Sequence, residues 1–178
     1  MPRSFELTAE YEQSVETVHR AFLEERYWQE RLADIPVDEA RLELMRVGES
    51  DDGFDGVKGS VEVVTLQMVR SHNLHAIVKQ LHRGDLCVRR AETWGPVVDG
   101  VATASIAGSI VDTPVQVSGT AELAPIAESG GARLAFQVDV HVRVPLIGGK
   151  VERLIGTHLA QLVSREQEFT TAWIANNG

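Results

Sequence analysis

The chain has 178 residues, and 43% of them are apolar, which is ordinary for a globular protein and too apolar for a disordered one. Its formal net charge of −9 disfavours non-specific binding to nucleic acid. A single cysteine, Cys87, excludes an intramolecular disulfide. No apolar run has the length that spans a membrane, and the first residues lack the apolar core of a signal peptide. We therefore expect a cytoplasmic protein of one domain, residues 1–178, without stable membrane insertion and without nucleic acid as a partner.

The first 36 residues predict a strand followed by two short helices. Apolar and polar residues alternate over residues 4–11, which is typical of a half-buried strand. Ser14 stands in an N-cap position, ahead of apolar residues at helical spacing. A second short helix is predicted from Glu25 to Leu32, and Pro36 ends it.

The middle of the chain is rich in predicted strands. Short alternating segments separated by turn residues predict an antiparallel meander. The clearest segment is 134–144, where Val138 and Val140 lie on the apolar face and Asp139 and His141 on the polar one. One stretch, His72 to His82, has helical spacing instead and predicts a short helix. The other predicted strands include Leu42–Leu44, Val57–Val63, Leu86–Trp94, residues 101–111 and Val115–Leu123.

After Pro145 and Gly148 the apolar period changes to 3.6, which indicates one long final helix. A helix of roughly 25 residues, ending near residue 175, would be close to 40 Å long and would cross a whole sheet. The sequence therefore predicts a two-layer α+β domain, in which a curved antiparallel sheet of about six or seven strands wraps a long C-terminal helix. The predicted apolar stripe of that helix contains Val151, Leu154, Ile155, His158, Leu159, Leu162, Phe169 and Trp173.

The order of these elements resembles the helix-grip fold of the START-like superfamily, which includes the Bet v 1-like pollen allergens and the polyketide cyclases. Three segments resemble, more specifically, an actinobacterial DUF2505-type family within that superfamily: 144–152 before the last helix, Tyr27-Trp28, and Glu92-Thr93-Trp94. The resemblance spans essentially the whole chain. It implies a hydrophobic ligand held between sheet and helix, and it carries no catalytic residue over to this chain.

Histidines and other reactive groups offer no clear metal or catalytic centre. His75 and His82 on one helix would lie about 10 Å apart along its axis, too far to share an ion. The simpler interpretation is that His72, His75 and His82 are surface histidines. Nucleophile-elbow, dinucleotide-binding and P-loop motifs do not occur. We expect no cofactor, no metal and no catalytic residue.

His158 and Glu166 both fall within the predicted apolar stripe of the last helix. An ionisable group that faces a dry core is costly unless it is paired. Either the stripe borders a partly wet pocket, or the two side chains pair with residues of the strands. Pairing in the core is the favoured interpretation, and a role in orienting a ligand or in acid–base chemistry is the alternative.

A pocket is predicted opposite the middle of the last helix, around Ile155, His158, Leu159 and Leu162. Small residues on a facing strand, Gly119 and Ala121, would leave a void there, and Gly119→Phe is expected to fill it without unfolding the domain. His158 would hold the polar end of a ligand. The remaining predicted wall residues are Val138, Val140 and Trp94.

Three functions follow, and the fold alone does not choose among them. The favoured hypothesis is a binding protein for a small hydrophobic molecule such as a lipid, a polyketide or an isoprenoid. The second is a cyclase or dehydratase that uses His158 or Glu166. The third is a partner-binding module, and the oligomeric state is left open. A large closed cavity would favour the first, a polar cluster at the end of a cavity the second, and a filled core with an exposed apolar patch the third.

Overall fold

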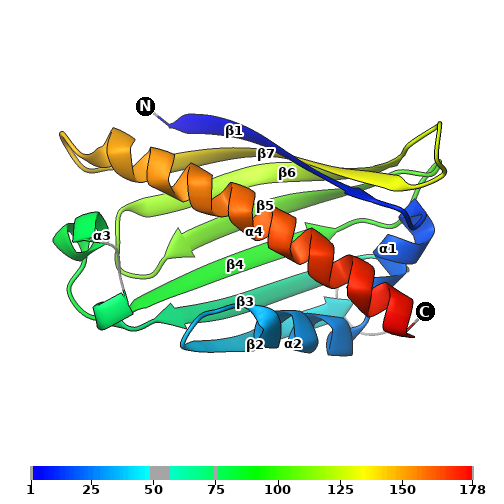
Figure 1. Ribbon diagram of the computed structural model, residues 1–178, viewed down its shortest axis with the longest axis horizontal. Coiled ribbons are helices and arrows are strands. Elements are labelled where there is room, and N and C mark those ends of the chain that lie inside the picture. Colours follow the sequence, from blue (N-terminus) through cyan, green and yellow to red (C-terminus); the bar gives the residue numbers. More distant parts are fainter. Residues whose placement is uncertain (1, 49–56, 74–75, 178) are drawn as a thin grey trace.

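A computed structural model describes residues 2–48, 57–73 and 76–177 of the chain (Figure 1). Its elements in chain order are β1 (Arg3–Tyr11), α1 (Val15–Phe22), α2 (Glu25–Asp34), β2 (Glu39–Val47), β3 (Val61–Val69), the 3-10 turn η1 (Ser71–Asn73), α3 (Ala76–Leu81), β4 (Leu86–Trp94), β5 (Ala102–Ile110), β6 (Val115–Pro125), β7 (Ala132–Val142) and α4 (Gly148–Asn177).

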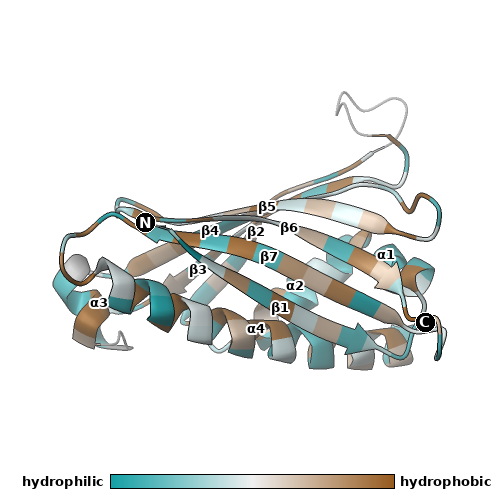
Figure 2. Ribbon diagram, turned by 90° about the horizontal axis from the view of Figure 1, so that it is seen from above, coloured by the Kyte–Doolittle hydropathy of each residue, from teal (hydrophilic) through white to brown (hydrophobic). Residues whose placement is uncertain are grey.

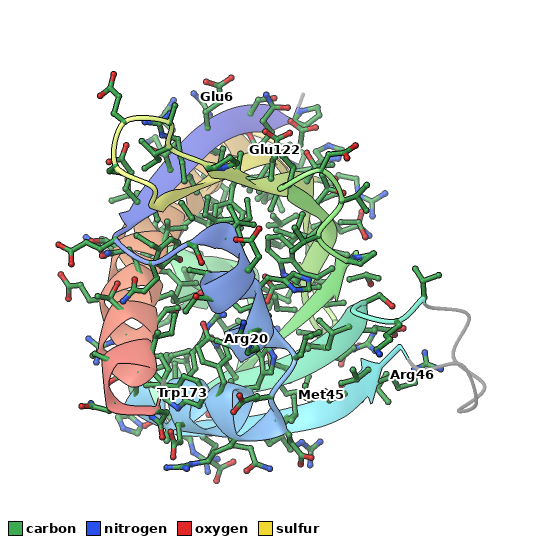
Figure 3. All side chains as sticks on the ribbon, turned by 90° about the vertical axis from the view of Figure 1, so that its right-hand side faces the viewer. Glu6, Arg20, Met45, Arg46, Glu122 and Trp173 are labelled. Atoms are coloured by element: carbon green, nitrogen blue, oxygen red, sulfur yellow. The ribbon has the colours of Figure 1, made fainter. Side chains whose placement is uncertain are left out.

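The strands form one seven-stranded sheet in the order β1-β7-β6-β5-β4-β3-β2. Every neighbouring pair in it is antiparallel. Helix α4 crosses one face of this sheet diagonally (Figure 1) and packs mainly against β1 and β7 (Figure 2). The sheet bends round the interior, and side chains fill the space between it and α4 (Figure 3). The predicted fold class is confirmed, including the strand number and the long final helix.

Strand β7 shows how sequence alternation becomes a buried and a wet face. Val138 and Val140 are buried on the inner face, whereas Asp139 is exposed and His141 is half-buried. The register is set on both sides, because Val140 pairs with Val117 of β6 and with Arg3 of β1. The predicted facing of this strand is therefore confirmed.

Two local predictions need correction. The strand predicted from Val57 begins only at Val61, because the chain turns before it and the Ser60 amide donates to the Val57 carbonyl at 3.0 Å. The helix predicted from His72 to His82 is divided into η1 and the shorter α3. In contrast, the Ser14 cap is confirmed, since its hydroxyl accepts the Thr17 amide at 3.2 Å.

The orientation of α4 differs from the predicted stripe. His158, predicted to face the sheet, is exposed, while Gly156 and Glu166 are buried. A Cβ atom on Gly156 would lie 2.2 Å from the Phe5 ring, so glycine allows β1 to approach the helix closely. The buried face of α4 includes Val151, Glu166 and Trp173 of the predicted stripe. It also includes Glu152, Gly156 and Thr170, which the apolar spacing did not reveal.

Buried side chains form two clusters at opposite ends of α4. We call the first the aromatic end; α1, α2 and the C-terminal half of α4 close it around Phe22, Tyr27, Trp28, Trp94 and Trp173. The second, the aliphatic end, consists of Val115, Val140, Val142 and Val151, with half-buried neighbours that include Ile77 of α3 and Ile155 and Leu159 of α4. No helix of the described residues is both long and apolar enough to cross a bilayer.

Candidate functional site

A small cavity lies between the sheet and α4 at the aromatic end. Five aromatic side chains line it: Tyr11, Phe22, Tyr27, Trp94 and Phe136. Four charged side chains, two apolar ones and one hydroxyl complete the wall: Arg31, Arg90, Glu92, Glu166, Leu134, Val163 and Thr170. Its volume of about 10 Å³ is close to what one water molecule requires.

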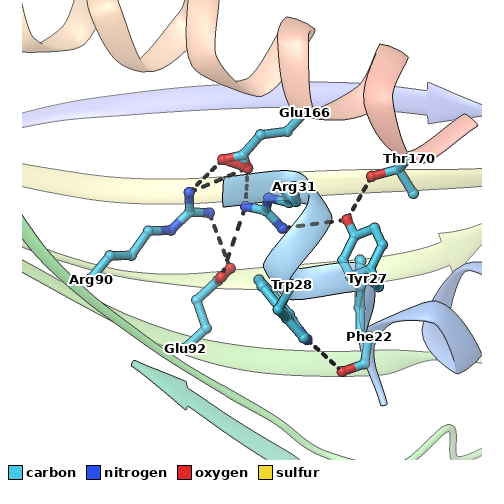
Figure 4. A network of polar contacts seen from close by, with 8 residues as sticks. All are labelled: Phe22, Tyr27, Trp28, Arg31, Arg90, Glu92, Glu166 and Thr170. Atoms are coloured by element: carbon cyan, nitrogen blue, oxygen red, sulfur yellow. Dashed lines mark hydrogen bonds and ion pairs between the residues drawn. The ribbon is translucent and has the colours of Figure 1, made fainter. Parts of the chain in front are cut away.

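The four charged residues, Arg31, Arg90, Glu92 and Glu166, come together from three elements and form what we call the charged quartet (Figure 4). Arg31 of α2 donates to Glu166 of α4, and Arg90 of β4 donates to both oxygens of the same carboxylate at 2.5 and 3.2 Å. Arg90 also reaches Glu92 at 3.1 Å, and Arg31 lies 4.0 Å from it. Two cations and two anions balance, which is the condition under which charges are tolerated in a core.

Mutual attraction keeps Glu166, Arg31 and Arg90 in their charged forms. Burial by itself raises the pKa of Glu166, but the attraction of Arg31 and Arg90 and their hydrogen bonds outweigh it, so the pKa is lowered. Burial by itself lowers the pKa of Arg31 and of Arg90, and the attraction of Glu166 reverses this in both. Glu166 therefore stays a carboxylate at neutral pH.

A second layer of contacts fixes Arg31 in place. Its Nη1 donates to the Tyr27 hydroxyl at 3.4 Å, and that hydroxyl lies 2.6 Å from the Thr170 hydroxyl on α4. The guanidinium carbon is 4.7 Å from the centre of the Trp28 ring, within the range of a cation–π contact. The Trp28 Nε1 in turn donates to the Phe22 carbonyl at 2.8 Å. Helices α1 and α2 thus lock the quartet against α4 (Figure 4).

Trp94, unlike the charged quartet and its neighbours, has a buried polar group without a hydrogen-bond partner in the described part of the chain. It is 1% exposed, and its Nε1 has no hydrogen-bond partner among the described residues. Trp94 shares a cross-strand row with Ala104, Ala121 and Phe136. An unpaired buried N–H is costly in a protein interior, and here it belongs to a residue on the cavity wall.

Two residues of the cavity wall are less buried than the rest. Ten of its twelve residues are buried, whereas Arg90 and Val163 are half-buried. The side chain of Arg90 is 18% exposed, against 10% for Glu166. Next to Arg90 in the sheet stand Gly108 of β5 and then Val117 of β6, both half-buried. Arg90 and Val163 are therefore the wall residues with the most contact with solvent.

The predicted pocket and this cavity are different places. Of the predicted site residues only Trp94 lines the cavity. His158 is exposed and cannot point a polar group inward. The other predicted wall residues do not line it: Ile155, Leu159 and Leu162 are half-buried, and Ala121, Val138 and Val140 are buried.

Gly119 corrects the idea of a void opposite the helix. A Cβ atom there would lie 2.2 Å from the Gln137 carbonyl oxygen and 2.9 Å from the Val138 Cα. The glycine is thus needed for the close approach of β6 and β7, and Gly119→Phe would disturb the sheet instead of filling a pocket. Ala121 is buried in the core and likewise leaves no void among the described residues.

Arg31, Arg90 and Glu92 were not singled out from the sequence as site residues. A signal was present for two of them, because Val88, Arg90, Glu92 and Trp94 share one parity on β4 and therefore one face. Two charges on an otherwise apolar face predict a buried ionic contact. Arg31 gave no such signal, since its partner Glu166 lies 135 residues away. His72 and His82 border a surface cleft, and His75 lies outside the described residues.

The chain matches one family model over residues 6–174. It belongs to DUF2505, a family described as being of unknown function. Uncharacterized proteins of Mycobacterium tuberculosis strain H37Rv and of Mycobacterium bovis are each 66% identical to it over 177 residues, or 99% of both chains.

Two solved structures show the fold to which this family belongs. The Zhui aromatase/cyclase of Streptomyces sp. R1128 superposes with a TM-score of 0.57 at 10% identity, covering 98% of this chain and 94% of that one. A START superfamily protein of Mycobacterium smegmatis superposes with a TM-score of 0.53 at 11% identity, covering 98% and 99%. The fold is therefore START-like, and identities this low establish no more than the fold.

Proposed function

We propose that this protein binds a small, largely apolar molecule between the sheet and α4, and that an oxygen of this molecule accepts a hydrogen bond from Trp94. The unpaired Nε1–H of Trp94 on the cavity wall carries the proposal. Small-molecule sites in proteins are mostly apolar and aromatic, with a few polar groups that fix orientation. Seven of the twelve residues around this cavity are aromatic or aliphatic.

The ligand's apolar body would extend from the cavity toward the aliphatic end. At about 10 Å³ the cavity takes only a water-sized group, so the rest of the molecule needs space gained by moving Arg90 and Val163, the two half-buried wall residues. Beyond them the inner face is lined by half-buried aliphatic residues such as Val117 and Leu159. A START-like fold commonly places its ligand in this layer, which agrees with the proposal.

Binding without chemistry is favoured by the state of Glu166. Two arginines occupy its oxygens and lower its pKa, so it has no proton to donate at neutral pH. His158, the other predicted acid–base residue, is exposed and outside the cavity. A protein of the same fold is named an aromatase/cyclase, but this chain does not present either predicted residue as a free acid or base.

The test compares two tryptophan variants that each delete one indole N–H. Titration with Prodan, an apolar naphthalene with one carbonyl oxygen and environment-sensitive fluorescence, measures affinity. Trp94→Phe should weaken binding roughly twofold to tenfold, as expected for one lost hydrogen bond. It should also lower stability, because Trp94 is 1% exposed and the smaller ring leaves a void. The matched control, Trp28→Phe, deletes the N–H that donates to Phe22; it should lower stability and leave affinity unchanged.

Two results would contradict the proposal. Equal Prodan affinity in wild type and Trp94→Phe would remove Trp94 as the anchor. No binding of Prodan by wild type, combined with no co-purifying molecule in native mass spectra of protein purified from a mycobacterial host, would exclude the binding function itself.

A further inference from the structure

An open cleft of about 310 Å³ lies on the surface at the end of the molecule where α3 packs (Figure 1). It is lined by Ser71 and His72 of η1, Lys79 of α3, and His82, Arg83 and Gly84 of the segment before β4. This cleft is separate from the cavity at the charged quartet, with which it shares no residue.

The cleft carries positive charge, and no carboxylate of the described residues lines it. Asp85, next along the chain, is already engaged, because it accepts the Ser71 amide at 2.8 Å and Arg70 Nη1 at 3.1 Å. His82 holds its own place through Nε2, which donates to the Asp85 carbonyl at 3.0 Å. Lys79 and Arg83 form no ion pair with any described residue.

Lys79 and Arg83 are distinguished by their shared position at one cleft. In a chain of net charge −9, eight of the fourteen arginines form an ion pair with a carboxylate of the described residues. Lys79 and Arg83 are instead exposed at a concave surface. The arginines that do form ion pairs are Arg26, Arg31, Arg46, Arg70, Arg89, Arg90, Arg133 and Arg165.

We propose that this cleft binds a phosphate group carried by a larger molecule. A guanidinium, an ammonium and the Ser71 hydroxyl supply donors suited to several phosphate oxygens, and arginine matches phosphate in a bidentate manner. A carboxylate, with only two oxygens, would use fewer of them. The cleft volume is about ten times the ≈30 Å³ that a water molecule occupies in the liquid, which leaves room for an organic group beside the phosphate.

The phosphate could belong to a soluble phosphate monoester or to a lipid headgroup, and the experiment separates these sources. Calorimetric titration with glycerol 3-phosphate tests the soluble form, with acetate as the anion control. Co-sedimentation with vesicles of phosphatidic acid and phosphatidylcholine, against vesicles of phosphatidylcholine alone, tests the headgroup. The variant is Lys79→Gln/Arg83→Gln, and Lys58→Gln, an exposed lysine in the turn before β3, controls for lost charge.

Wild type should bind glycerol 3-phosphate, phosphatidic acid vesicles or both, and acetate much more weakly. The double variant should lose at least about tenfold in affinity, because two charge-assisted hydrogen bonds are removed, while Lys58→Gln should behave as wild type. Binding of only one form identifies the source. Absence of both forms of binding, equal binding of acetate, or an unaffected double variant would each overturn the proposal.

Discussion

The two ends of α4 are packed in different ways, although one helix and one sheet build both. At the aromatic end, rings from α1, α2, β4 and α4 meet at centroid distances such as 5.1 Å for Phe22 and Trp94 and 5.4 Å for Tyr27 and Trp173. At the aliphatic end Ile77, Ile110 and Ile155 remain half-buried around a small cluster of valines. The helices α1 and α2 close one end, whereas only the short α3 approaches the other.

This difference shows why the charged quartet lies where it does. Buried charges are stable only if their partners are held in a fixed geometry. The aromatic end provides that geometry through Trp28 and Tyr27, which hold Arg31 from two sides. The aliphatic end has no comparable polar cluster among its described core residues.

The largest effect is expected from breaking the quartet. Glu166→Ala leaves Arg31 and Arg90 with only Glu92, and we expect unfolding to become easier by about 3–5 kcal/mol. Glu168→Ala, an exposed position on the same helix, should change stability by less than about 0.5 kcal/mol. Urea unfolding measures both. If the two variants are equally stable, the quartet does not hold the aromatic end together.

The packing difference itself can be measured with one substitution made at each end of α4. Ile174 at the aromatic end is 7% exposed, and Ile174→Ala should cost about 2–5 kcal/mol. Ile155 at the aliphatic end is half-buried, so Ile155→Ala should cost roughly half as much, because less apolar surface leaves water there on folding. Equal shifts in the urea midpoint would show that the two ends are packed alike.

The smallest expected effect is a change in stability at acidic pH. The pKa of Glu166 is lower in the folded protein than in the unfolded chain, so on acidification the unfolded chain takes up this proton first. The stabilisation is complete above the ordinary glutamate pKa of about 4.3 and is lost as pH falls below it. The difference in stability between wild type and Glu166→Gln should therefore narrow below about pH 4.3. A difference that stays constant from pH 7 to pH 3 would contradict this assignment.

Local patterns predicted the elements well, for identifiable reasons. Alternation in 134–144 and the change of period after Pro145 are properties of the chain itself, and both survive folding as β7 and α4. The Ser14 hydroxyl accepts a hydrogen bond from an amide only three residues away, so its role as a helix cap can also be predicted from local sequence. The expectation of a single domain over residues 1–178 stays a prediction.

The candidate site was much less predictable. Trp94 was expected at a pocket and lines the cavity, whereas the other predicted pocket residues do not line it. His158 lies in an apolar stripe yet is exposed, because the close contact of Gly156 with Phe5 and the pairing of Glu166 set the rotation of α4. Hydrophobic periodicity cannot predict these contacts, because the two residues in each contact lie far apart in the chain.

Sequence alone therefore determined the type and order of the elements, the START-like fold class and the inner face of β7, because these follow from residue spacing and near neighbours. Only the tertiary structure decided which face of α4 meets the sheet, and it alone joined Arg31, Arg90, Glu92 and Glu166 into one network. The reason is physical: a charge enters a core only where its partner is present, and partners from α2, β4 and α4 become neighbours only when the sheet has bent round the helix.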